Sequence, residues 1–186
     1  MEPLYIKNDS GDVTYNYPRV VVLQTLFSGQ SSGSGGLFPV IGISSHALSI
    51  DDVKQGLRNH YQGTANDPYE TQSNPPDRPI SIMRTAFSHI TQLRASLPPA
   101  IGNIEYIAMG MADLSIYIPF YQGLTTIPSE YQSVTDGVVD SNSVYWKYRK
   151  LQALVLQNYP KYAPQAHTMI NPRFRSWHSS CRAQTT

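Results

Sequence analysis

Cysteine is nearly absent from the chain, since Cys181 is the only one among 186 residues. A single cysteine excludes an internal disulfide framework and any zinc site built from several thiolates. Charge is also scarce: Asp, Glu, Lys and Arg make up 15% of the residues, and their formal net charge is +1. A nearly neutral surface has no strong field to attract nucleic acid or an acidic membrane. We therefore expect neither as a partner.

Long apolar runs are missing as well. The longest extend over a few residues, as in Val20–Leu23, whereas a membrane-spanning helix needs about 20. The first residues, Met1–Asp9, lack the basic segment and the apolar segment of a signal peptide. We therefore expect a soluble, cytoplasmic protein.

The composition predicts one ordinary domain, because 40% of the residues are hydrophobic and 186 residues are enough to enclose a single core. Residues 28–36 are rich in glycine and serine and are predicted to form a mobile surface loop. A domain boundary there is the less favoured alternative, since too few residues precede it to fold alone. We expect one domain over residues 1–170 and a loose tail over residues 171–186.

The segment from Ser49 onward has the signature of a helix start. Ser49 and Asp52 have the spacing of a capping box, in which the hydroxyl and the carboxylate each bond the other residue's backbone amide. Apolar residues then recur at helical spacing as far as Tyr61, and Gly63 is a natural stop. Asp51 and Asp52 could also form an acid–base pair, but helix capping explains both without a catalytic role.

A second helix is predicted over Ser143–Tyr159, where apolar side chains form a wide stripe. Asn142 or the first residue of the segment can cap it, and Pro160 is expected to end it. The apolar segment Arg19–Phe27 fits both a helix and a strand, because its length is too short for periodicity to decide.

Strands are indicated in the middle of the chain. Ile104–Met109 and Ser115–Tyr121 alternate aromatic and β-branched residues around the turn Gly110–Asp113, which is typical of a hairpin. Pro119 lacks an amide proton and therefore favours a sheet edge or a strand end. Ala86–Arg94 fits a strand or a helix. Together these segments predict an α+β fold with an antiparallel sheet and flanking helices.

Common catalytic motifs are absent: the sequence has no phosphate-binding glycine loop, no HExxH and no GxSxG. We therefore expect no cofactor and no metal. His178 and Cys181 are close in sequence, but a catalytic pair needs a fixed geometry that a loose tail does not provide. The proline-rich segment Asn66–Pro79 is predicted to be a long irregular loop, a kind of segment that is often functional. The histidines on or beside predicted elements are interpreted as structural; they are His46, His60 and His89.

Several short motifs occur in the order found in one enzyme family. They are Tyr17–Val20, His60–Thr64, Asp67–Tyr69, Arg78–Ser81, Gly102–Tyr106, Tyr117–Gly123 and Asn142–Trp146. Through them the chain resembles the bacterial cysteine dipeptidases of the dipeptidase A and D type. The resemblance extends from about Tyr15 to Pro164.

This resemblance implies an N-terminal-nucleophile hydrolase with a four-layer αββα sandwich. In that family a cysteine at the start of the processed chain attacks the peptide, its own amino group acts as base, and a small peptide is the substrate. Here the chain begins with Met1, and Cys181 lies near its other end. We therefore expect the C-terminal part of such an enzyme, inactive alone, with the N-terminal segment as its partner. The isolated chain should expose apolar surface and self-associate.

Related amidohydrolases have a catalytic arginine at a comparable place, which makes Arg78 the first catalytic candidate by resemblance and Arg84 the second. A guanidinium there could stabilise developing negative charge or bind the substrate carboxylate. His60 and Asp67 match family landmarks and are candidates for the substrate cleft, although this segment could simply anchor the end of the helix. The alternative for Arg78 is a structural ion pair, for which the nearby carboxylates are Asp67, Glu70 and Asp77.

A different class of function is also open at this point. The chain could be a non-catalytic interaction module or the remnant of a split dipeptidase gene, because the tail does not continue the family's last helix as expected. A third alternative, in which Cys181 acts as a new nucleophile, is less favoured because a loose tail does not hold the cysteine in a fixed geometry.

Overall fold

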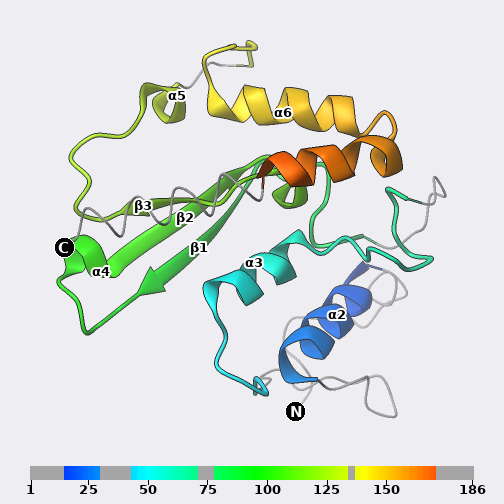
Figure 1. Ribbon diagram of the computed structural model, residues 1–186, viewed down its shortest axis with the longest axis horizontal. Helices are drawn as coiled ribbons and strands as arrows, with labels where there is room; N and C mark the ends of the chain where they lie inside the picture. Colours follow the sequence, from blue (N-terminus) through cyan, green and yellow to red (C-terminus); the bar gives the residue numbers. More distant parts are fainter. Residues whose placement is uncertain (1–14, 30–42, 71–77, 134–136, 171–186) are drawn as a thin grey trace. The chain divides into compact units, whose positions relative to one another are not determined.

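The computed structural model describes residues 15–29, 43–70, 78–133 and 137–170. The chain forms two compact units, the first up to Ile82 and the second from Met83 onward. Helices and a small antiparallel sheet make up the described part (Figure 1), which confirms the predicted α+β class. The four-layer sandwich and the domain limits at residues 170 and 171 stay predictions. The predicted loop over residues 28–36 lies almost wholly outside the described residues.

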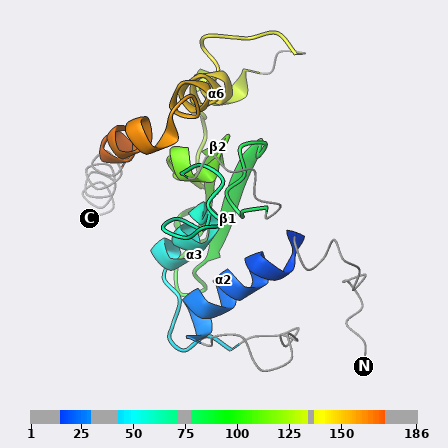
Figure 2. The same cartoon turned by 90° about the vertical axis from the view of Figure 1, so that its right-hand side faces the viewer.

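The first unit contains two helices that lie next to each other (Figure 2). The first, α2, spans Tyr17–Ser28, so the ambiguous segment in this region is helical. Gly29 ends it in the left-handed conformation, with φ of 67°, and donates its N–H to Thr25 at 3.2 Å. The helices approach closely at Gly56, where a β-carbon would lie 2.7 Å from the Phe27 ring. A β-carbon at that position would therefore force the Phe27 ring to shift.

The second helix, α3, spans Ile50–Arg58 and begins with the predicted capping box. The Ser49 N–H donates to Asp52 Oδ2 at 2.8 Å, and the Asp52 N–H donates to Ser49 Oγ at 3.2 Å. The hydrogen bond from the Ser49 hydroxyl is the main cause that lowers the pKa of Asp52. Asp51 instead bonds Lys54, at 3.1 Å between Oδ1 and Nζ. The two neighbouring carboxylates thus have separate structural roles, as the capping interpretation predicted.

Replacing Ser49 by alanine should lower the free energy of unfolding by about 1 kcal/mol, because the first turn of α3 loses a cap. Part of this loss depends on pH. The folded-state pKa of Asp52 lies below its unfolded-state value, so its carboxylate stabilises the fold above the unfolded-state pKa and loses that effect as the pH falls through the folded-state pKa. Urea unfolding of the parent and Ser49→Ala, at about pH 7 and about pH 3, should show a smaller difference at acid pH. A difference that grows on acidification would contradict this assignment.

The second unit is organised around a three-stranded antiparallel sheet in the order β1-β2-β3. The strands are β1, Phe87–Leu93; β2, Asn103–Met109; and β3, Ile118–Tyr121. Every second residue of β2 is buried, which matches the alternation seen in the sequence. The hairpin between β2 and β3 is confirmed, but its connection is longer than predicted and contains the 3₁₀ helix η1, Ala112–Leu114. Gly110 begins this connection with φ of 77°.

Pro119 lies on an edge strand, as predicted. It is paired with Tyr106 of β2. The Gln122 N–H donates to Asn103 O at 3.0 Å, and the residues of an antiparallel strand bond to their neighbour alternately, so the even-numbered residues of β3 bond to β2. The position of the missing N–H of Pro119 is therefore on the outer side of β3. The sheet therefore loses no hydrogen bond there.

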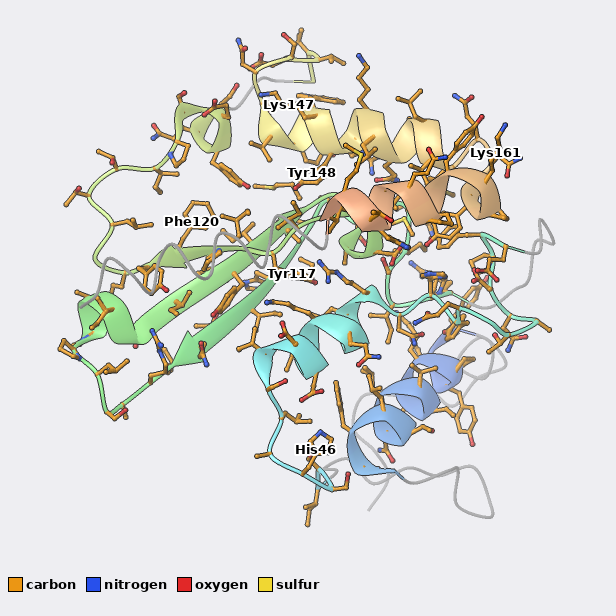
Figure 3. The ribbon with its side chains drawn as sticks, viewed as in Figure 1. His46, Tyr117, Phe120, Lys147, Tyr148 and Lys161 are labelled. Atoms are coloured by element: carbon orange, nitrogen blue, oxygen red, sulfur yellow. The ribbon has the colours of Figure 1, made fainter. Side chains whose placement is uncertain are left out.

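Helices flank the sheet. They are α4, Pro99–Gly102; α5, Ser129–Gln132; and α6, Val144–Val155; residues 159–170 are helical as well. The α6 helix packs against η1 and β2, and the hydroxyl of its Tyr148 accepts the Ile116 N–H at 3.4 Å (Tyr148 is labelled in Figure 3). Ser143 precedes α6 at the capping position but makes no side-chain cap. The prediction that Pro160 ends this helix is wrong, because α6 ends at Val155 and Pro160 stands in the first turn of the next helical segment, where a missing N–H is tolerated.

Candidate functional site

The candidate site in the first unit begins where α3 ends. The apolar spacing predicted a helix through Tyr61, but α3 ends at Arg58. Asn59 is extended, and its side-chain oxygen accepts the N–H of Tyr61 at 3.0 Å. Tyr61 has a φ of 67°, which is costly for a residue with a β-carbon. The tyrosine is buried, as its spacing indicated, but a tight turn rather than a helix places it there.

The turn brings His60 and Asp67 together. His60 Nδ1 and Asp67 Oδ2 lie 3.0 Å apart, and the two residues are 4% and 0% exposed. The second carboxylate oxygen of Asp67 accepts the N–H of Tyr69 at 2.9 Å, and the Tyr69 ring contacts the His60 ring edge-on at 5.6 Å. A buried carboxylate needs such partners. The two cleft candidates from the sequence are therefore one buried unit.

Two tyrosine hydroxyls attach this buried unit to the segment that carries Arg78. Tyr61 donates to the backbone carbonyl of Arg78 at 2.8 Å, and Tyr69 donates to that of Ser81 at 3.1 Å. The Ser81 N–H in turn donates to the Asn59 carbonyl at 2.8 Å. The backbone on both sides of Pro79 is thus fixed against the turn after α3.

The Arg78 side chain is exposed, unlike its backbone anchor. Its guanidinium carbon lies 5.7 Å from the centre of the Tyr15 ring, a distance typical of a cation–π contact. No carboxylate of the described residues forms an ion pair with Arg78; the alternative partner Asp77 lies outside them. A fixed backbone and an exposed guanidinium suit an anionic ligand.

Arg84, the second candidate, belongs to the second unit and is exposed. Within the described residues it has no ion pair or hydrogen bond that would fix its side chain. His178 and Cys181 lie outside the described residues. No three His, Cys, Asp or Glu side chains of the described ranges are grouped so that they could hold a metal ion.

The second unit contains a polar cluster that no sequence motif predicts. Asp113 of η1 accepts a hydrogen bond from the buried Tyr159 hydroxyl through Oδ2, and His167 Nε2 lies 2.9 Å from the same oxygen. Asp113 is 9% exposed and Tyr159 is 4% exposed. The cluster attaches the helical segment 159–170 to the connection between β2 and β3. No local motif could reveal it, because its members are far apart in sequence.

His89 is more exposed than the interpretation as a structural histidine implied. Its side chain is 62% exposed, and its Nδ1 lies 2.6 Å from Glu105 Oε1 on the neighbouring strand. Thr91 donates to the other oxygen of Glu105 at 2.5 Å. Both hydrogen bonds lower the pKa of Glu105, and the bond from Thr91 has the larger effect. The pair links β1 to β2 across the surface of the sheet.

None of the helices in the described ranges is both long enough and apolar enough to cross a membrane.

Comparison with known proteins connects these features to one family. The model of peptidase family C69 matches residues 1–171. The chain is 50% identical over 125 residues to a "Probable dipeptidase" of Salmonella dublin, covering 64% of this chain and 29% of the relative. It is 31% identical over 157 residues to "Dipeptidase A" of Lactobacillus helveticus, covering 81% of this chain and 33% of the relative. A "Probable dipeptidase A" of Streptococcus pyogenes serotype M3 is 27% identical over 178 residues, covering 92% of this chain and 38% of the relative.

The chain thus spans about a third of the length of these relatives. The family model covers both units, including the turn after α3 and the segment with Arg78. The expected resemblance is confirmed: the chain belongs to peptidase family C69.

Proposed function

We propose that this chain is a segment of a cysteine-type dipeptidase that hydrolyses small unblocked peptides. The match to peptidase family C69 over residues 1–171 carries the proposal, and the dipeptidase names of the relatives support it. The chain spans 29% of the Salmonella relative and 33% of the Lactobacillus relative. The nucleophilic cysteine belongs, in this proposal, to the part of a family-length protein that this chain does not span.

The reaction needs a nucleophile, a group that transfers protons and a group that binds negative charge. The cysteine thiolate attacks the carbonyl carbon of the peptide bond, and the bond to the leaving amine breaks after the nitrogen gains a proton. The product is a thioester, which water hydrolyses to release the acid and regenerate the thiol. Cys181, the one cysteine in this sequence, is not the nucleophile in this proposal, so the chain alone is expected to be inactive. The chain can, however, supply a group that binds negative charge.

Arg78 is the residue proposed for that role. A dipeptide has a free carboxylate, and a guanidinium can bind it through two parallel hydrogen bonds. The alternative role is to stabilise negative charge on the carbonyl oxygen during attack. In both roles the buried His60–Asp67 pair positions Arg78 indirectly. The neighbouring Tyr61 and Tyr69 donate hydrogen bonds to backbone carbonyls of residues 78–81 and so hold that segment in place.

The test is a chimera of full family length. In the Salmonella relative, the 125 matched residues are replaced by those of this chain, and hydrolysis of unblocked dipeptides is followed by the release of free amino acids. The parent relative is the positive control and the isolated 186-residue chain the negative one. We expect activity in the chimera that thiol alkylation abolishes, and none in the isolated chain.

The other outcomes separate the alternatives. A folded but inactive chimera beside an active parent would overturn the proposal and favour a non-catalytic interaction module. Activity of the isolated chain, abolished by alkylation of its single cysteine, would overturn the proposed location of the nucleophile and indicate Cys181 instead.

A further inference from the structure

The two edges of the sheet differ in a way that concerns association. On one side, β3 is short, Ile118–Tyr121, and Pro119 removes an outward N–H from it. Short edge strands and proline are features that prevent pairing with another chain. On the other side, β1 spans Phe87–Leu93 and contains neither proline nor lysine. The described residues place no strand beside its outer edge.

The hydrogen bonds identify which residues of β1 form that outer edge. Gly110 N–H donates to Ala86 O at 2.7 Å, and Arg94 N–H donates to Gly102 O at 3.1 Å, so the even-numbered residues of β1 bond to β2. In an antiparallel pair the bonding residues alternate. The backbone groups of the odd-numbered residues therefore point away from the sheet; they are Phe87, His89, Thr91 and Leu93.

The side chains of these same residues are exposed. Phe87 is 59% exposed and Leu93 is 73% exposed, at opposite ends of the strand, while His89 and Thr91 lie between them. Apolar ends and a polar centre make the edge symmetric. Such a strand can pair with its own copy about a two-fold axis.

We propose that β1 pairs antiparallel with β1 of a second copy of this chain, centred on Ile90. This register places Phe87 opposite Leu93 and His89 opposite Thr91 of the second copy. All of these are outward-bonding residues, as an antiparallel ladder requires. Aromatic and aliphatic side chains then face each other, and no like charges are opposed. The two sheets become one continuous sheet, and the self-association expected from the sequence has a defined surface.

The first experiment measures association of the 186-residue chain by sedimentation velocity over a range of concentrations up to about 100 µM, with a reductant to keep Cys181 from forming disulfides. The parent should dimerise. Thr91→Pro removes an outward N–H without removing a bond to β2 and should weaken the dimer at least about tenfold. Thr91→Val is the matched control: it loses the bond to Glu105 but keeps the N–H, and should dimerise like the parent.

A second pair of variants tests the register and does not depend on proline. Phe87→Lys alone should weaken the dimer, and adding Leu93→Glu should restore it, because the two new charges face each other only in the register centred on Ile90. Circular dichroism confirms that each variant is folded. A parent that is monomeric at about 100 µM, a dimer unaffected by both Thr91→Pro and Phe87→Lys, or a failure of the double variant to recover would each overturn the proposal.

Discussion

Replacing Asp67 by alanine should lower the free energy of unfolding of the first unit by about 2–5 kcal/mol. The carboxylate is fully buried, and it binds His60 Nδ1 at 3.0 Å and the Tyr69 N–H at 2.9 Å. Removing it leaves the buried His60 nitrogen and the half-buried Tyr69 N–H without that partner, and such polar groups are costly when unsatisfied. Because a typical domain is stable by only about 5–15 kcal/mol, this single change should remove a large part of the stability.

Two control variants separate this effect from an ordinary loop substitution. Glu70→Ala changes an exposed carboxylate in the same loop and should alter the free energy of unfolding by less than about 0.5 kcal/mol. Asp67→Asn keeps the shape and one acceptor oxygen, so it should fall between the other two. Urea unfolding, followed by circular dichroism, measures all three. An Asp67→Ala variant as stable as Glu70→Ala would mean that the pair does not hold the turn.

The sequence predicted those parts of the fold that depend on neighbouring residues. The capping box at Ser49 and the placement of Pro119 on an edge follow from local chemistry, and both are confirmed. The helix α3 ends at Arg58, whereas the apolar spacing predicted that it continues to Tyr61. The same spacing is satisfied by a turn that buries the Tyr61 ring. Spacing reports that a side chain is buried, and the backbone that buries it depends on contacts such as the bond to Arg78 O.

The site shows the same division between local and distant information. His60 and Asp67 are seven residues apart, and both belong to short motifs that carry the family resemblance. The contacts of Asp113 with Tyr159 and His167 cross 46 and 54 residues. Such contacts depend on how the helical segment 159–170 returns to η1, which no local pattern encodes. The same holds for the tyrosine bonds that fix residues 78–81.

Arg78→Ala should lower kcat/KM for dipeptides about 10²–10³-fold in the family-length chimera, whether the guanidinium binds the carboxylate or the developing oxyanion. Stability should change little, because the side chain is exposed and the anchoring bonds involve its backbone. Arg84→Ala is the matched control, an exposed arginine of the second unit, and its kcat/KM should stay within about twofold of the chimera. If Arg84→Ala shows the loss and Arg78→Ala does not, the assignment of the two arginines is reversed.

The distribution of the effect between KM and kcat decides which role Arg78 has. Binding of the carboxylate exists already in the ground state, so its loss should raise KM and leave kcat nearly unchanged. Stabilisation of the oxyanion exists only in the transition state, so its loss should lower kcat. Dipeptide amides, which lack the carboxylate, add an independent measurement. A carboxylate-binding Arg78 should favour free dipeptides over their amides, and Arg78→Ala should abolish that preference, whereas an oxyanion-binding Arg78 should leave it intact.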